Sequence, residues 1–490
     1  MIWILAGACV LAAVPAGLRW LRVAQREHYI PWEVTKFSLR WWYGTGAVNQ
    51  ALDYAAAISI LFAVGLDPFW AFVVPGVSAV GPIGLSIKGV TSPLAWTDRL
   101  RRVAIVSSIA FLVLVGVGGL VDQPWLVALP LYLLPALIDL TLWVLGPYER
   151  RKGDKWVEKA ASKLKTVGPR VVAITGSYGK TTTKNYLAHL LGGSMRVVAS
   201  PASFNNRMGL ARAINENLAP GTEVFIAEMG TYGYGEIAEL CAWIPPDVGA
   251  MVSIGPVHLE RFGSTRDIAR AKSEILDRAG VGVLCVDYPE LRQVADERES
   301  LLPIIEVSAR DGIHVDGVRV MDVPQGVFAA NLAVALGVCR ALGIDLTAAL
   351  TRTGDLPKAE HRQSTIESPA GFTIIDDTFN SNPDGARSAL LALRQAVDGG
   401  RTAVITPGMV ELGSVQDYEN EEFAKASAMI VDDLVIVGRT NRESLLRGSG
   451  NGTASVTVVR SRSEAVDWVR ENLGPGDAVL YENDLPDHYP

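Results

Sequence analysis

Long apolar runs dominate the first part of the chain. Five such runs follow one another, at about residues 2–18, 47–66, 68–87, 103–121 and 125–145. Each approaches the roughly 20 residues that a helix needs to cross the hydrocarbon core of a bilayer. Buried helices of a water-soluble core are the alternative, but five runs in succession are too many for one such core. The pattern predicts an α-helical membrane region over residues 1–147, with about five spans.

The basic residues between the runs predict an orientation. Lys and Arg follow the first, third and fifth runs, whereas the loops around Asp67 and Asp122 contain neither. By the positive-inside rule, the amino terminus then lies outside, and everything after Tyr148 lies in the cytoplasm behind a basic linker at 148–168. No basic residue precedes the first run and no small-residue cleavage site follows it. We therefore expect a retained span and not a signal peptide.

Two acidic residues interrupt the apolar pattern. Asp53 lies near the start of the second run and Asp139 near the end of the fifth, so the predicted topology places both near the cytoplasmic face. A charge inside a membrane is costly unless it is paired or hydrated. Two interpretations stay open: both acids lie in water at the interface, or they line a polar notch for a lipid head group.

Composition supports a membrane protein and excludes some functions. Hydrophobic residues make up 49% of the 490 residues, and the mean hydropathy of +0.23 is high for a soluble protein. The formal net charge is −7 without a Lys-rich or Arg-rich tail, so nucleic acid is not an expected partner. The four cysteines are far apart and form no CxxC pair, which excludes a zinc ribbon and favours buried thiols.

From residue 170 the pattern changes to short strands and helices. The segment RVVAI predicts a strand, the glycine loop TGSYGK follows, and TKNYLAHLL has the apolar spacing of a helix. A strand, a glycine loop and a helix in this order form a phosphate-binding loop, in which backbone N–H groups hold the anion. Ala173 occupies the first glycine position of the strict motif. The residues that we expect at the nucleotide are Gly176, Gly179, Lys180, Thr181 and Thr182.

Three later residues are candidates for a metal site. The apolar segment 224–230 contains Glu228 at the end of a predicted strand, where an acid beside a phosphate loop can bind Mg²⁺, although such an acid alone is commonly a surface or capping residue. His258 follows a further predicted strand. Lys272 lies on the next predicted helix, where a solvated surface lysine is the alternative interpretation.

Six segments together identify a family resemblance. They are TGSYGKTTTK, EMG, GPVHLERFGSTRDIARAKSEI, LPKAEHRQS, IIDDTFNSNP and GMVELG. Their order and spacing resemble the Mur ligases over about residues 169–480, most of all the branch that adds D-alanyl-D-alanine to UDP-N-acetylmuramoyl-tripeptide. The resemblance implies two α/β domains: a P-loop Mur ligase central domain at 169–362 and a small Rossmann-like C-terminal domain at 363–490.

The resemblance also implies a chemistry and a set of residues. Mur ligases phosphorylate a carboxylate with ATP, and an amine attacks the resulting acyl phosphate. Lys272 matches a lysine that is carbamylated in this family, and its carbamate is an anionic oxygen ligand. The implied catalytic residues are Lys180, His258, Lys272 and Asp377, and the implied Mg²⁺ ligands are Thr181, Glu228, His258 and Lys272. Asn331, Arg362 and Asp377 are implied at the nucleotide, and Asn205, Asn206, Asn380 and Asn382 at the substrates.

The chain departs from the family at both ends. Membrane spans replace the family's usual UDP-binding domain, and the last strand continues into YENDLPDHYP where the family commonly has Lys-Gly-Ser. Ala330 also replaces the usual His or Tyr before Asn331.

We therefore expect a multi-pass, ATP-dependent and ADP-forming amide ligase at the inner membrane of a bacterium. Its expected partners are a muramyl peptide or lipid-linked carboxylate, an amino acid or dipeptide amine, and membrane lipid. A polyglutamate-type ligase and a non-catalytic nucleotide-binding scaffold are the alternatives. A transport ATPase is disfavoured, because the chain has no LSGGQ-like signature.

Overall fold

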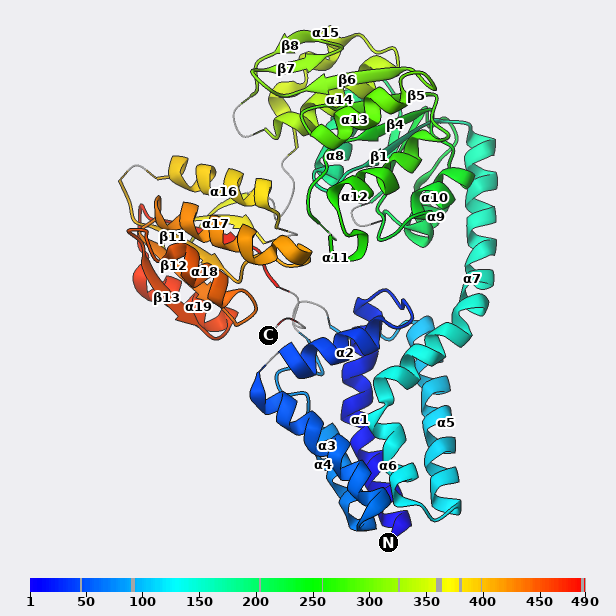
Figure 1. Cartoon of the computed structure of the whole chain (residues 1–490). Coiled ribbons are helices and arrows are strands. Elements are labelled where there is room, and N and C mark those ends of the chain that lie inside the picture. The colour runs from blue at the N-terminus through cyan, green and yellow to red at the C-terminus, as the bar shows by residue number, and fades with distance from the viewer. Residues whose placement is uncertain are drawn as a thin grey trace. The chain divides into compact units, whose positions relative to one another are not determined.

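The computed structural model describes residues 1–44, 46–89, 93–201, 204–257, 259–324, 327–357, 364–378, 381–397, 399–485 and 489. Two compact units make up the chain, with the first unit holding Met1–Lys152 and the second Gly153–Asp484. The first unit is helical, and the second contains two β-sheets with helices around them (Figure 1). The predicted linker at 148–168 lies almost entirely within one long helix, α7 (Leu134–Val167).

Three helices of the first unit are long and apolar enough to cross a membrane: α1 (Ile2–Arg26), α3 (Ala47–Gly65) and α5 (Asp98–Leu120). A fourth candidate is the pair α6 (Pro124–Tyr132) and α7, which is bent by 67° and forms either a broken span or a re-entrant loop. The described residues thus hold three or four candidate spans, and the expected number of five is not confirmed.

Helix breakers explain the difference in span number. The expected run 68–87 forms only a short 3₁₀ helix, η1 (Pro68–Phe72), and α4 (Val73–Val80), because the chain leaves the helical conformation at Gly81, before Pro82. Pro130 inside α6 and Pro135 near the start of α7 remove backbone donors on both sides of the bend.

The first unit has a buried core and an apolar surface. In the core, α1 packs against α4, α5 and α6, and Leu5, Cys9 and Val127 are fully buried there. Large apolar side chains also point outward: Ile4, Leu11, Leu61, Leu112 and Leu120 are each more than half exposed. An apolar surface of this extent is typical of a membrane or protein interface.

Asp139 of α7 has a structural role in this unit. Its carboxylate accepts hydrogen bonds from the Thr35 backbone N–H at 2.7 Å, the Thr35 hydroxyl at 2.6 Å and the Val34 N–H at 3.3 Å. These donors lie in the first turn of α2 (Glu33–Gly44), so Asp139 satisfies groups that the helix itself leaves without partners. The two acids therefore differ in role: Asp139 caps a helix, whereas Asp53 takes no part in this cap.

An eight-stranded sheet forms the centre of the first α/β domain. The strand order is β2-β3-β1-β4-β5-β6-β7-β8, and the pairs from β2 to β6 are parallel. The bounds are β1 (Arg170–Thr175), β2 (Val197–Ala199), β3 (Val224–Glu228), β4 (Val248–Met251), β5 (Val281–Cys285), β6 (Ile304–Ser308), β7 (Ile313–Val315) and β8 (Val318–Met321). β1, β3 and β4 are almost wholly buried, as parallel strands covered on both faces are. Their carboxyl ends meet at one edge, where Ile174 pairs with Glu228 and Thr175 with Met251.

The second α/β domain has a six-stranded sheet of order β13-β12-β11-β14-β10-β9, parallel except for the pair β9 and β10. Its strands are β9 (Ser364–Glu367), β10 (Thr373–Asp377), β11 (Thr402–Thr406), β12 (Asp433–Val437), β13 (Ser455–Val459) and β14 (Ala478–Glu482). Its longer helices are α16 (Pro383–Gln395), α17 (Gln416–Ala428), α18 (Arg442–Ser449) and α19 (Arg462–Asn472). The expectation of two α/β domains is confirmed.

Candidate active site

The glycine loop lies between β1 and α8 (Lys180–Leu191), as the sequence predicts. Gly179 has φ +74°, and a Cβ at this position would lie 2.5 Å from Nδ2 of Asn331, so only glycine fits without strain. Gly179 is also the N-cap of α8 and offers no side-chain cap. The first backbone N–H groups of α8 can therefore bind an anion.

A second segment of chain holds this loop in place. The Tyr178 N–H donates to Oγ of Ser253 at 2.8 Å, and the Ser253 hydroxyl lies 3.0 Å from the Tyr178 carbonyl oxygen. The Ser177 hydroxyl accepts from the Gly255 N–H at 3.0 Å. Because Ser253 and Gly255 follow β4, the sheet edge fixes the loop conformation before any phosphate binds.

Lys180 and Thr181 open α8 at the centre of the site. The Lys180 ammonium donates to the carbonyl oxygens of Gly176 at 2.8 Å and Ser177 at 3.3 Å, so its charge lies over the loop. The Thr181 hydroxyl donates to Oε2 of Glu228 at 2.9 Å. The predicted cation, hydroxyl and carboxylate are therefore brought together at one sheet edge.

Glu228 has a further partner that the sequence interpretation missed. Lys184, one turn after Lys180 on α8, lies with Nζ 2.9 Å from Oε2 of Glu228, and the two side chains are only 2% and 3% exposed. Burial by itself raises the pKa of Glu228, but the charges of Lys184 and Lys180 and the hydrogen bonds outweigh it, so the pKa lies below its usual range. Glu228 is therefore an ionised carboxylate near neutral pH.

The two oxygens of Glu228 are used differently. Oε2 accepts hydrogen bonds from both Lys184 and Thr181, whereas among the described residues Oε1 has only a long contact, 3.4 Å, from Nδ2 of Asn205. A carboxylate oxygen and a threonine hydroxyl are hard ligands of the kind that Mg²⁺ prefers. Glu228 and Thr181 therefore fit the predicted metal, and the glycine loop with Lys180 fits the phosphates of ATP.

Lys272 is buried and not a solvated surface lysine. It lies on α12 (Thr265–Ser273), and its side chain is 3% exposed. The pKa of Lys272 is lowered well below its usual value, mainly by burial and to a smaller extent by the nearby charge of Lys180. In the part of the chain that the structure describes, no group of three His, Cys, Asp or Glu side chains could hold a metal ion.

The other predicted site residues fall into three groups. Asn331 of α14 (Ala329–Ala341) donates from Nδ2 to the Gly179 carbonyl at 2.9 Å, and Thr182 and Asp377 are buried, the latter at the end of β10. Asn206 and Asn382 each cap a helix, α9 (Arg207–Asn217) and α16, through hydrogen bonds of 3.0 Å from Gly209 and Gly385. His258, Arg362 and Asn380 lie outside the described residues.

A buried acid in the second α/β domain is a further residue that sequence reasoning missed. Glu482 at the end of β14 is fully buried and pairs in register with Asp377. It accepts hydrogen bonds from the Thr406 hydroxyl at 2.7 Å and from the Ser381 hydroxyl. The pKa of Glu482 is raised to about 8, mainly by burial. The hydrogen bond from Thr406 acts against this rise, and the charge of Asp377 adds to it. The only sequence signal was the departure from Lys-Gly-Ser.

This arrangement defines a class of enzyme: a nucleotide-binding α/β protein that places a phosphate loop beside a strand-end carboxylate. Two family models match the chain, the Mur ligase middle domain over residues 174–327 and the Mur ligase, glutamate ligase domain over 361–481. The chain belongs to the Mur ligase family, and it is an ATP-dependent, ADP-forming amide ligase. The predicted resemblance is therefore confirmed.

Individual relatives agree with this assignment. The chain is 30% identical over 384 residues to the UDP-N-acetylmuramoyl-tripeptide--D-alanyl-D-alanine ligase of Mycobacterium leprae. The alignment covers 66% of this chain and 73% of the relative. The enzyme of the same name from Bacillus subtilis is 27% identical over 347 residues, and the alignment covers 66% of this chain and 75% of that enzyme. MurF from Thermotoga maritima in complex with ADP superposes with a TM-score of 0.56 at 25% identity, and the superposition covers 68% of this chain and 80% of that structure. MurF from Acinetobacter baumannii, at 24% identity and a TM-score of 0.58 with 67% and 77% covered, supports the fold.

Proposed function

We propose that this protein is a membrane-anchored ligase of peptidoglycan precursor synthesis, which activates a muramyl-type carboxylate for attack by a D-alanyl-D-alanine-type amine. The convergence of Thr181, Glu228 and Lys184 beside the phosphate loop is the observation that carries the ligase activity. The names of the relatives from Mycobacterium and Bacillus support the choice of substrates.

Each residue of the site has a distinct task in this proposal. Lys180 and the amino terminus of α8 bind the phosphates, while Thr181 and Oε1 of Glu228 hold Mg²⁺. ATP supplies the phosphoryl group that converts the substrate carboxylate into an acyl phosphate. Cations are needed more than a base, because a carboxylate and the phosphates are all anionic and repel one another. We assign His258, Asp377, Arg362 and Asn380 the roles that the family resemblance implies.

Lys272 enters the site as a carbamate in this proposal. A protonated lysine repels Mg²⁺, but burial favours the neutral amine, which is the form that attacks CO₂. The product is an anionic oxygen ligand, and it supplies the further ligand that the described His, Cys, Asp and Glu side chains do not provide.

The membrane unit anchors the enzyme at the inner face. The outward-facing apolar side chains of α1, α3 and α5 support insertion, and the basic loops support an outside amino terminus with the α/β domains in the cytoplasm. Neither family model covers the first 173 residues, where the family resemblance implies a UDP-binding domain. We infer that the acyl substrate is lipid-linked, because a membrane unit occupies the place of the domain that would bind UDP.

The deciding experiment compares two substrates in one assay. Full-length protein in membranes receives ATP and D-alanyl-D-alanine, with either a UDP-linked or a lipid-linked muramyl tripeptide, and ADP release is measured. We expect turnover with the lipid-linked substrate and none in Lys180→Ala. Turnover on the UDP-linked tripeptide alone would overturn the lipid-substrate inference but retain the ligase. Turnover with glutamate in place of the dipeptide would indicate a polyglutamate-type ligase. ATP binding without ADP release under any of these conditions would indicate a non-catalytic scaffold.

A further inference from the structure

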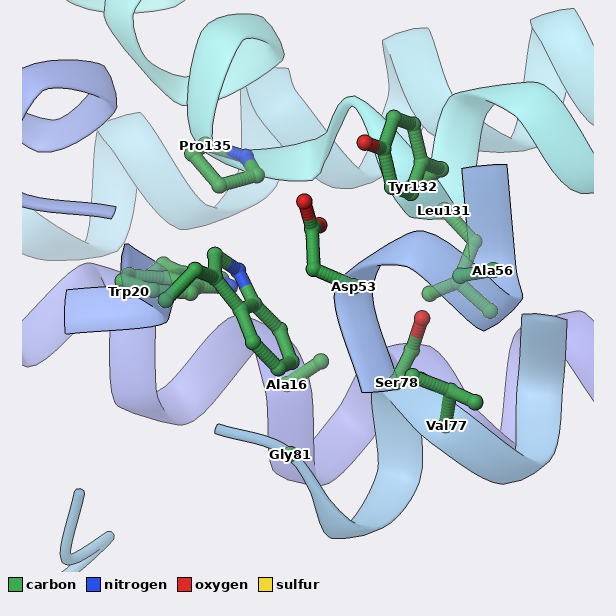
Figure 2. A pocket seen from close by; sticks show the side chains of 11 residues that line it. Ala16, Trp20, Asp53, Ala56, Val77, Ser78, Gly81, Leu131, Tyr132 and Pro135 are labelled. Atoms are coloured by element: carbon green, nitrogen blue, oxygen red, sulfur yellow. The ribbon is translucent and has the colours of Figure 1, made fainter. Parts of the chain in front are cut away.

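A cavity opens inside the membrane unit beside Asp53 (Figure 2). Its walls come from α1, α2, α3, α4 and the junction of α6 with α7, and they include three aromatic residues, Trp20, Trp42 and Tyr132. Figure 2 shows the Asp53 carboxyl group between the Tyr132 ring, Pro135 and Trp20. Asp53 is 5% exposed and lies in the candidate span α3, where a buried charge is costly without a partner.

In the part of the chain that the structure describes, Asp53 has hydrogen-bond donors but no cation beside it. The Tyr43 hydroxyl donates to its Oδ2 at 2.7 Å, and among the described residues no ion pair involves Asp53. Arg19, a buried cation of the same unit, is already used: its guanidinium donates to the carbonyl oxygens of Ala79 at 2.8 Å and Gly81 at 2.9 Å. Among the described residues, the Asp53 carboxylate thus faces the cavity beside two phenols, Tyr43 and Tyr132, and without a counter-charge.

The size and the walls of the cavity select the ligand chemistry. Its volume, measured for the centres of water-sized groups, is about 20 Å³. About one or two such groups fit into that space. A divalent metal ion needs about six oxygen ligands, and one carboxylate among aromatic rings does not supply them. An ammonium group is the size of water, donates three hydrogen bonds and is attracted to aromatic faces.

We propose that this cavity binds a primary ammonium group, with Asp53 as its counter-ion and the aromatic residues as its walls. The ammonium can belong to the head group of phosphatidylethanolamine or to a free amine. The site depends on the membrane unit alone, so it does not rest on the ligase activity.

The first test uses the wild-type full-length protein in nanodiscs. Native mass spectrometry measures lipid retained from equal mixtures of phosphatidylethanolamine with either phosphatidylcholine or phosphatidylglycerol. We expect phosphatidylethanolamine to be retained about tenfold over both. The trimethylammonium group of phosphatidylcholine has no N–H donors and exceeds the cavity size, and phosphatidylglycerol has no ammonium group. A parallel arm adds ethylamine to phosphatidylglycerol nanodiscs and measures the melting temperature. A rise there without lipid selectivity would support the site with a free amine as its ligand.

Variants link either effect to Asp53. Asp53→Asn should abolish the lipid preference or the ethylamine shift, whereas Asp122→Asn should leave them unchanged. Asp122 is exposed, and its φ of +55° is one that Asn also adopts, so this control removes the same charge from the same unit without strain. The absence of both effects in wild-type protein, or their full persistence in a folded Asp53→Asn, would overturn the proposal.

Discussion

Lys184 and Glu228 form an ion pair at 2.9 Å in which both side chains are almost completely buried. The pair joins α8 to the end of β3, and Thr181 donates to the same carboxylate oxygen. Removing one member of a buried pair leaves an uncompensated charge, so the pair couples the stability of the domain to the orientation of Glu228. Lys184 thereby acts as a positioning residue, since it holds Oε2 and leaves Oε1 for a cation.

Lys184→Met should therefore lower both stability and activity. We expect a loss of about 3 kcal/mol in the free energy of unfolding, because Glu228 stays buried without its partner. ADP release should need more Mg²⁺, since neutralisation and disorder of Glu228 weaken a metal ligand. Denaturant unfolding and a Mg²⁺ titration of ADP release measure the two effects.

Two further variants separate the causes. Lys425→Met removes an exposed lysine that pairs with Glu422 at 3.3 Å, and it should change stability by no more than about 0.5 kcal/mol. The double variant Lys184→Met with Glu228→Gln should regain stability without regaining activity. Wild-type Mg²⁺ dependence in Lys184→Met would show that Lys184 does not position Glu228.

Gly179 provides a second prediction. Gly179→Ala must adopt φ +74° and must also displace the Asn331 amide, which lies 2.5 Å from the new Cβ and bonds to the loop. Gly343→Ala is the matched control, because Gly343 has φ +72° but nothing within 4 Å of its Cβ position. We expect both to lose about 1 kcal/mol from backbone strain, but only Gly179→Ala to raise the KM for ATP. Equal KM values in the two variants would contradict the assignment of this loop to ATP.

The α/β domains and the phosphate loop are predictable from sequence because their signals are local. Parallel strands buried on both faces read as continuous apolar runs, and the loop requires glycine at a fixed distance from Lys180. Lys184 is not predictable in this way, since its partner lies 44 residues further along the chain and nothing local marks the contact. The one hint in the sequence is that Lys184 lies four residues after Lys180, on the same helix face.

The span number and two asparagines show a different limit. Hydropathy averages over a window, so it does not register that α4 ends at Val80, before Gly81, or that α6 and α7 meet at a bend. Asn206 and Asn382 stand before helices, and a helix cap and a substrate contact need the same short polar side chain there. The structure shows the cap, and the substrate contact stays a prediction.

Lys272 provides a third prediction, on bicarbonate. Removal of CO₂ and bicarbonate should reduce ADP release by about 100-fold, as expected when a metal ligand is lost, and added bicarbonate should restore it. Labelled bicarbonate should give a carbamate signal in carbon NMR spectra of wild-type protein and none in Lys272→Ala. Full activity without bicarbonate would exclude the carbamate.

Glu482 provides a prediction on pH. Its pKa rises from an ordinary 4.5 to about 8 in the folded protein, so the folded state keeps a proton that the unfolded chain releases above about pH 4.5. The unfolded chain therefore binds fewer protons between these values, and stability falls as the pH rises from 4.5 to 8. Below pH 4.5 both states are protonated, and the group has no effect on stability.

Glu482→Gln resembles the protonated acid and should remove this dependence. At pH 4 it should match the wild type, and at pH 7 its sheet should be more stable by about 3 kcal/mol. Hydrogen exchange of β10 and β14, compared between the two proteins at each pH, measures this difference locally. Glu471→Gln on the exposed face of α19 is the control and should follow the wild type. Equal hydrogen-exchange protection of β10 and β14 in wild type and Glu482→Gln from pH 5 to pH 8 would show that Glu482 is not held protonated. Another interaction would then offset the cost of burying its ionised carboxyl beside Asp377.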